Sequence, residues 1–99
     1  MKVEQFYNKN QFHLYGNGQH ILQSYNSTVV IIEYTASGYI ITLGRDWDYS
    51  KTTSKHVYLF LEEYLPRDII NLSKAKGNKR AYIQKLIDNH DIGYNEELR

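Results

Sequence analysis

The chain contains no cysteine and only one proline, and its 12 basic and 11 acidic side chains leave a formal charge of +1. Without cysteine it has no disulfide framework, no thiolate metal site and no cysteine nucleophile, which suits a reducing compartment. The balanced charge lacks the basic excess typical of nucleic-acid-binding proteins and the acidic excess of proteins that mimic DNA. The longest apolar run, residues 29–32, is too short to cross a bilayer, and no signal-peptide stretch opens the chain. We therefore expect a cytoplasmic protein without membrane contact.

What the chain does contain is tyrosine, with 10 in 99 residues, beside three phenylalanines and one tryptophan. Tyrosine combines a large apolar ring with a hydroxyl that tolerates water, and it is frequent at interfaces and at the rims of small cores. The length fits one domain, and 41% hydrophobic residues place it in the globular range. We expect a single domain over residues 1–99 with a modest core.

The N-terminal half predicts two β-hairpins. Asn17-Gly18 suits the positive φ angles of a type I′ turn, which pairs Tyr15 with His20 and His13 with Leu22. A second turn at residues 35–38 pairs Tyr34 with Tyr39. The pairing gathers one wholly apolar face, made of Val30, Ile32, Tyr34, Tyr39, Ile41 and Leu43. The first hairpin leaves an open edge at residues 12–15, and such an edge is a template for pairing with a second copy, so a homodimer is a candidate assembly.

The C-terminal half predicts helices that cover this face. Ser50 or Thr53 can cap a helix whose apolar residues recur with helical spacing, namely Val57, Phe60, Leu61, Tyr64 and Leu65. Pro66 ends the helix or bends it into a short second one through Ile69, Ile70 and Leu72. A last helix is expected over about 79–90, with Ile83, Leu86, Ile87 and His90 on one stripe. The predicted fold is α+β: a four-stranded antiparallel sheet over about 12–43, two or three helices over about 51–90 on one face, and a frayed tail at 91–99.

The loop before the first helix carries the most specific pattern in the chain. Four of its residues have structural roles available: Trp47 as a plug for the core, and Ser50, Thr52 and Thr53 as bonding groups in the first helical turn. Its exposed members are candidates for contacting a partner, and these are Asp48, Tyr49, Lys55 and His56.

Trp-Asp-Tyr-Ser-x-Thr-Thr-x-Lys-His-x-x-x-Phe-Leu, after an upstream Ser-Tyr-Asn, resembles a family of small uncharacterised proteins from bacteriophages, prophages and related mobile elements. The matching positions span about residues 23–61, whereas residues 66–99 look particular to this chain. The family has no established enzymatic activity. The resemblance therefore implies a non-enzymatic protein, working in a bacterial cytoplasm, that binds and inhibits a host protein, with host-defence nucleases such as CRISPR effectors among the candidate targets.

Catalysis and metal binding have weaker support. His56 can meet Thr52 across one helical turn as a base beside a hydroxyl, but no third group or oxyanion hole is apparent. Asp46 and Asp48 flank Trp47 and are expected to point apart. His13 and His20 are diagonal neighbours without a third ligand, which predicts a half-exposed strand face rather than a zinc site. We expect no enzyme activity, no cofactor and no metal.

A run without acidic residues offers an alternative function. It carries the candidate nucleic-acid-binding or acidic-surface-binding residues Lys74, Lys76, Lys79, Arg80, Tyr82 and Lys85. Such a segment can bind phosphates of a nucleic acid or an acidic surface of a partner. The plainer interpretation is a solvated helix face balanced by acids elsewhere.

Overall fold

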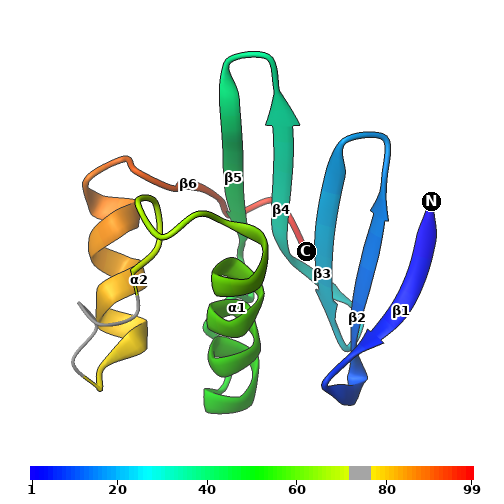
Figure 1. Cartoon of the computed structure of the whole chain (residues 1–99). Helices are drawn as coiled ribbons and strands as arrows, with labels where there is room; N and C mark the ends of the chain where they lie inside the picture. The colour runs from blue at the N-terminus through cyan, green and yellow to red at the C-terminus, as the bar shows by residue number, and fades with distance from the viewer. Residues whose placement is uncertain (72–76) are drawn as a thin grey trace.

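A computed structural model gives the arrangement of residues 1–71 and 77–99, and over these residues the fold is α+β. Six strands form one sheet in the order β1-β2-β3-β4-β5-β6, antiparallel except that β6 runs parallel to β5 (Figure 1). The strands are β1 (Lys2–Phe6), β2 (Asn8–Gly16), β3 (Gln19–Ser24), β4 (Ser27–Thr35), β5 (Gly38–Gly44) and β6 (Gly93–Asn95). The helices in the described residues are α1 (Lys51–Tyr64) and α2 (Lys79–Asp88). The predicted class is thus confirmed, but the predicted four-stranded antiparallel sheet is wrong in extent and in being wholly antiparallel.

Both predicted hairpins have the expected register. Tyr15 pairs with His20 across the first turn, and Tyr34 pairs with Tyr39 across the second. Asn17 takes φ 51 and Gly18 takes φ 75, the left-handed conformation that the turn requires. Because the side chains of a strand alternate between faces, these two registers determine which residues of β2 to β5 face the core.

The two outer strands were not predicted from the sequence. β1 pairs with β2 and covers the edge that was expected to lie open at residues 12–15, so that edge prediction is wrong. β6 replaces the predicted frayed tail: Ile92 is buried, and the Arg45 N–H donates to the carbonyl of Leu98 over 2.8 Å. The tail packs closely against β5 because Gly44 has no side chain. A Cβ atom at this position would clash with the backbone oxygens of Thr28 and Leu98.

The helix starts follow the sequence signals. Ser50 caps α1 with its side-chain oxygen, which accepts from the Thr53 N–H, and Asn78 caps α2 by accepting from Ala81. α1 ends at Tyr64, two residues before Pro66.

The predicted second helix is absent as far as residue 71. A turn takes its place, in which the N–H groups of Ile69 and Ile70 both donate to the carbonyl of Pro66. Leu72, the last residue of that prediction, lies outside the described residues. α2 ends at Asp88 rather than at His90, which is exposed and takes φ 62. No helix among residues 1–71 and 77–99 is long and apolar enough to cross a membrane.

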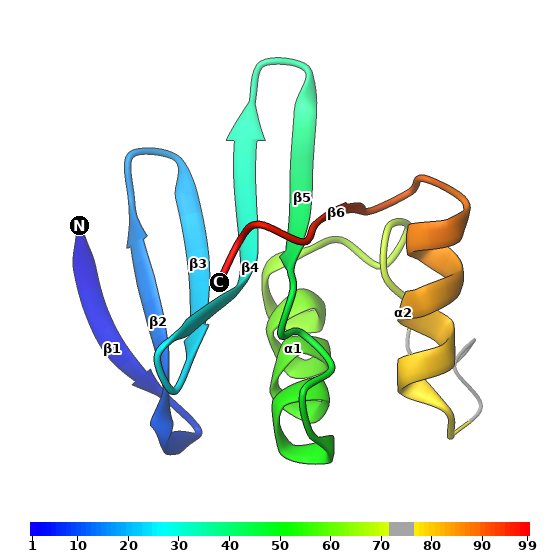
Figure 2. The same cartoon turned by 180° about the vertical axis from the view of Figure 1, so that it is seen from behind.

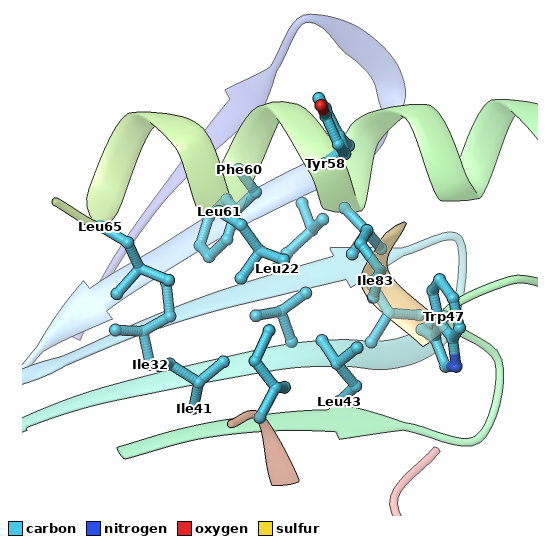
Figure 3. Close-up of a cluster of buried hydrophobic side chains, with 14 of the residues drawn as sticks. Leu22, Ile32, Ile41, Leu43, Trp47, Tyr58, Phe60, Leu61, Leu65 and Ile83 are labelled. Carbon is cyan, nitrogen blue, oxygen red and sulfur yellow. The ribbon is translucent and has the colours of Figure 1, made fainter. Parts of the chain in front are cut away.

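α1 packs on β3 and β4, and α2 lies beside α1 (Figures 1 and 2). The core between the helices and the sheet contains Leu22, Ile32 and Leu43 from the strands and Phe60 and Leu61 from α1 (Figure 3). Trp47 lies at one end of this core and is 2% exposed, the position that its predicted role as a plug requires. Burial of large rings of this kind supplies much of the stability of a small domain.

One end of the molecule collects the segments discussed below. The β1–β2 turn, the β3–β4 turn, the loop after β5 and the N-termini of both helices all lie at the lower end in Figure 1. We call this the motif end, because the loop at residues 46–50 lies there. The β2–β3 and β4–β5 turns lie at the opposite end.

Candidate functional site

Three hydroxyl groups join the two separate parts of the sequence motif. Ser24, the last residue of β3, has its Oγ 3.2 Å from Oγ1 of Thr53 in the first turn of α1. The same Thr53 oxygen accepts from Ser50 Oγ at 3.2 Å, and the Thr53 N–H donates back to Ser50 at 3.1 Å. Ser24 and Thr53 are both buried. These bonds tie the start of α1 to the sheet, so this part of the motif is architectural.

Beside these hydroxyls lies a surface hollow of about 540 Å³, which we call the motif hollow. The Ser-Tyr-Asn segment forms one side with Tyr25 and Asn26, and the loop after β5 forms the other with Asp46 and Tyr49. Ser27 Oγ donates to Asp46 Oδ2 over 2.8 Å and so connects the two sides at the base. Segments about twenty residues apart in sequence therefore make one surface.

Three of the most exposed tyrosines lie at the motif end. Tyr49 is 78% exposed, Tyr7 is 70% exposed and Tyr25 is 51% exposed. Tyr7 and Tyr25 both take the left-handed conformation, with φ 60 and φ 56. The backbone holds the Tyr25 turn in place, because its N–H donates to the carbonyl of Asn10 at 2.7 Å.

A second hollow of about 540 Å³ adjoins the first at Tyr49 and Ser50, and we call it the basic hollow. The first turns of both helices line it, and its charged residues are Asp48, Lys51, Lys55, Lys79 and Arg80. Arg80 donates to Asp48 Oδ2 through Nη2 at 2.8 Å and through Nε at 3.2 Å. The candidate partner-binding loop and part of the candidate basic run thus form one face.

His56 corrects the predicted partner-binding set. It is 6% exposed, and its Nδ1 donates to the backbone carbonyl of Thr52 at 2.7 Å, because a carbonyl can only accept. The imidazole therefore lies in the core edge beside Phe6, with ring centroids 6.4 Å apart, rather than on the surface. The contact with Thr52 involves its backbone and not its hydroxyl, so the suggested base–hydroxyl pair is not formed. Lys55 and Tyr49 are exposed as expected.

The basic run does not act as one surface in the described residues. Lys79 and Arg80 face the basic hollow, whereas Lys85 lines a different hollow between α2 and β5. Tyr82 is half-buried, and its hydroxyl accepts from the Asn71 N–H at 3.0 Å. Lys74 and Lys76 lie outside the described residues.

His13 differs from the prediction of a half-exposed strand face, whereas His20 is half-buried as that prediction expects. His13 is 3% exposed, its Nδ1 lies 2.7 Å from Oε1 of Glu4, and its Nε2 lies 2.8 Å from Nδ1 of His20. The carboxylate accepts, so Nδ1 of His13 donates to it, and a second hydrogen bond joins Nε2 of His13 to Nδ1 of His20. Burial and the neighbouring His13 lower the pKa of His20, and burial together with nearby carboxylates raises the pKa of Tyr64 to about 12.

Sequence reasoning missed this cluster because Glu4 belongs to a strand that was not predicted. The hydroxyl of Tyr64 also lies 3.1 Å from Nδ1 of His13. The register of the first hairpin had already placed His13 and His20 as diagonal neighbours, and that placement was the available signal. Among residues 1–71 and 77–99, no group of three or more histidine, cysteine or acidic side chains could hold a metal ion.

One buried polar side chain stands out beneath the motif. Gln11 is the pairing partner of Ser24 and is 0% exposed. Neither its Nε2 nor its Oε1 has a hydrogen-bond partner within the described part of the chain. A buried amide without partners destabilises a fold by about 1–3 kcal/mol, and such groups are uncommon in native proteins.

Comparison with known proteins gives a family and nothing finer. No curated protein and no solved structure matches the chain. A family model matches from β1 to most of α2, which is more than the expected span of about residues 23–61, so residues 66–85 are not particular to this chain. The chain belongs to a family of unknown function, DUF8033, whose model matches residues 1–85.

Proposed function

We propose that this chain is a non-enzymatic binding protein that holds a partner protein at its motif end, through Tyr7, Tyr25 and Tyr49. The observation that carries the proposal is the conformation of Tyr25. A bulky residue in the left-handed region costs about 1–2 kcal/mol relative to glycine, which occupies such positions without strain. Retention of a tyrosine in this strained conformation is explained if its ring contacts the partner protein at the position that the turn gives it.

The surroundings of Tyr25 favour protein contact. Tyr49, on the other side of the motif hollow, is 78% exposed, and Tyr7 adds a second strained and exposed ring at the same end. Tyrosine contributes large contact areas at low cost in side-chain entropy and is enriched among residues that dominate binding energy. The exposed Asn26 and Thr52, which also line the motif hollow, offer an amide and a hydroxyl for hydrogen bonds around these rings.

We propose no catalytic activity, because the side chains that could act as a base or a nucleophile already make hydrogen bonds within the fold. Nδ1 of His56 is held by a backbone carbonyl, and the hydroxyls of Ser24, Ser50 and Thr53 bond to one another. These groups stabilise the start of α1. A binding function needs no more from them than a rigid base for the tyrosines.

We propose further that the protein is made by a bacteriophage or a related mobile element and that its partner is a host protein. The resemblance of the Trp-Asp-Tyr-Ser motif supports this setting. A small protein of this kind would inhibit by stoichiometric occlusion, and a host-defence nuclease such as a CRISPR effector is the target class that we favour. The bacterial cytoplasm is the compartment that such a target implies.

The test combines target inhibition with two tyrosine variants. The wild-type protein, added at a one-to-one ratio to purified CRISPR effector nucleases, is expected to bind at least one of them and to stop its DNA cleavage. Tyr49→Ser should weaken that binding by about 2 kcal/mol, or roughly 30-fold, the size expected for a residue that dominates an interface. Tyr34→Ser is the matched control, since Tyr34 is 67% exposed at the opposite end.

Tyr25→Asn separates function from stability. Asparagine tolerates the left-handed conformation, so the variant should be at least as stable as the wild type and yet bind the partner more weakly. Equal binding by the wild type and by both motif-end variants would contradict the proposal, as would a Tyr34→Ser variant that loses binding to the same extent.

A further inference from the structure

We propose that the basic hollow binds the phosphate groups of a single-stranded nucleic acid. The proposal differs from the protein-binding function above, because its cations come from the two helix starts; the two functions share Tyr49, which borders both hollows. It also differs from a site along the linear run at residues 74–85, since half of its cations come from α1.

The first support is the convergence of cations from two helices. Lys51 and Lys55 on α1 and Lys79 and Arg80 on α2 are exposed, and all four line the same hollow. Asp48 is the one acid among its lining residues. Four of the 12 basic side chains of a chain with a net charge of +1 thus line one hollow. The net charge of the chain does not reveal such a patch, but the local electrostatic potential is what attracts an anion.

The second support is that these cations occupy positions that weaken the helices. The N-terminus of a helix carries a partial positive charge, so acidic residues stabilise the first turn and basic residues destabilise it. Neither α1 nor α2 has an acid in its first turn, and Lys51 and Lys79 each occupy the first helical position. Lys51 and Lys55 are also like charges four residues apart, which repel on a helix face. Two helices that violate the same rule at the same place indicate a site for an anion.

Asp48 offsets only one of the four positive charges of this hollow. It binds the Nε and Nη2 groups of Arg80, whose side chain remains 67% exposed. Within residues 1–71 and 77–99, no hydrogen bond engages Nη1 of Arg80, so that group can donate to a phosphate oxygen. Lys79 also lines the hollow, and its side chain lies over the Tyr58 ring, with Nζ 4.7 Å from the centroid.

Tyr49 favours a single strand over a duplex or an acidic protein surface. Its ring is 78% exposed and borders the basic hollow. Exposed aromatic rings beside cations stack unpaired bases, whereas the bases of a duplex are already stacked within it. An acidic protein surface would use the charges, but a single strand supplies both phosphates for the cations and unpaired bases for this ring.

The experiment is anisotropy titration of a fluorescein-labelled 20-nucleotide oligothymidylate with the full-length protein. Four phosphate contacts predict a fall in affinity of roughly 50-fold between 50 and 200 mM salt, because each contact releases about 0.7 counterion from a single strand. A duplex of the same length should bind more weakly. Tyr49→Ala should reduce binding of the oligonucleotide by about tenfold, within the range measured for loss of one stacked base.

Charge-matched variants locate the site. The double variant Lys55→Gln/Lys79→Gln should lose at least roughly tenfold in affinity at 50 mM salt and show a shallower salt dependence. Lys2→Gln/Lys85→Gln removes the same charge away from the hollow and should bind like the wild type. Melting curves of both double variants check that each is folded.

Several results would overturn the proposal. These are no binding at 50 mM salt, binding that does not weaken with salt, equal losses in the two double variants, or tighter binding of poly-glutamate than of the oligonucleotide, which would assign the hollow to an acidic protein. Tyr25→Asn should leave oligonucleotide binding intact, so failure here and failure of the protein-binding function are distinguishable.

Discussion

Ser24 and Thr53, which are 29 residues apart in sequence, share a buried hydrogen bond of 3.2 Å between their side-chain oxygens. This contact joins the end of β3 to the first turn of α1. The first turn of α1 cannot shift relative to the sheet without breaking this hydrogen bond. The bond therefore helps to determine where Tyr49 and the cations at the start of α1 lie on the surface.

Thr53→Val tests the structural weight of this contact. Valine keeps the shape but removes the oxygen that serves both Ser24 and Ser50, and we expect the free energy of unfolding to fall by about 1–3 kcal/mol. Urea unfolding measures the change. Thr52→Val is the control, because Thr52 is exposed and should change stability by no more than about 0.5 kcal/mol. Equal effects of the two substitutions would count against the hydroxyl contact.

Trp47→Ala should destabilise the fold by about 3–5 kcal/mol, the usual range for removing a large core aromatic. The indole is 2% exposed, so the emission of the single tryptophan should be blue-shifted in the native protein and should shift red on unfolding. The stability of a domain is about 5–15 kcal/mol, so at the lower end of that range this loss would leave the variant close to unfolding. Trp47→Phe keeps part of the ring and should unfold at an intermediate denaturant concentration. A red native spectrum would contradict the burial.

Gln11→Met should stabilise the protein by about 1 kcal/mol or more. Methionine has nearly the shape of glutamine and removes both buried amide atoms that lack partners in the described residues. Thermal melts of the two proteins give the comparison. A loss of stability on this substitution would mean that the amide makes favourable contacts and is retained for them.

Lys51→Glu should raise the free energy of unfolding by about 0.3–1 kcal/mol, because it places an acid at the first position of α1 and removes the repulsion with Lys55. Denaturant unfolding at low salt measures the gain, which should shrink at high salt. Lys2→Glu on β1 makes the same change in net charge away from any helix end and serves as the control. If both variants gain equally, the effect belongs to net charge and not to the helix end.

The stability of the protein should fall as the pH drops below about 6.5. The pKa of His20 is lowered from 6.5, chiefly by burial and then by His13, so the unfolded chain binds a proton in a range where the folded chain does not. The groups around His20 are His13, with its Glu4 contact, and the rings of Tyr15 and Tyr64.

Urea unfolding between pH 5 and 8 tests this, and His20→Gln should flatten the acid side of the profile. An unchanged slope in that variant would assign the effect to another group. The raised pKa of Tyr64, about 12 against 10.0, predicts a second loss of stability on the alkaline side. That loss begins as the pH rises through 10, where the unfolded tyrosine ionises first. Tyr64→Phe should reduce the loss, and Tyr58, whose pKa is also raised chiefly by burial, should account for what remains.

Much of the central architecture was predictable because its signals are local. Asn17-Gly18 determines the first hairpin, since few residues other than asparagine and glycine tolerate its positive φ angles. Once that turn and the second hairpin turn at residues 35–38 are placed, alternation determines the core face of β2 to β5. Ser50 and Pro66 likewise mark the two ends of α1, because a cap and a missing N–H act within one helical turn.

The outer strands were not predictable because their signals are not local. β1 has four exposed residues out of five, and β6 is three exposed residues long, so neither has the apolar alternation of a strand. Their backbone groups pair only because β2 and β5 offer open edges. The burial of His56 was not predictable for the same reason. His56 lies beside the core residue Val57 on α1, but its side chain is covered only because Phe6, on the unpredicted strand β1, packs against it.

The candidate sites were also partly predictable from the sequence and partly dependent on the tertiary structure. The sequence by itself determined which residue types were present, including the Ser-Tyr-Asn and Trp-Asp-Tyr-Ser segments and the lysines near each helix start. Only the tertiary structure decided that Tyr25 and Tyr49 border one hollow, and that Lys51 and Lys79 face another together. The physical reason is that helical and strand periodicity act over a few residues, whereas the docking of α2 beside α1 depends on side chains such as Ile83, buried from a distant part of the chain.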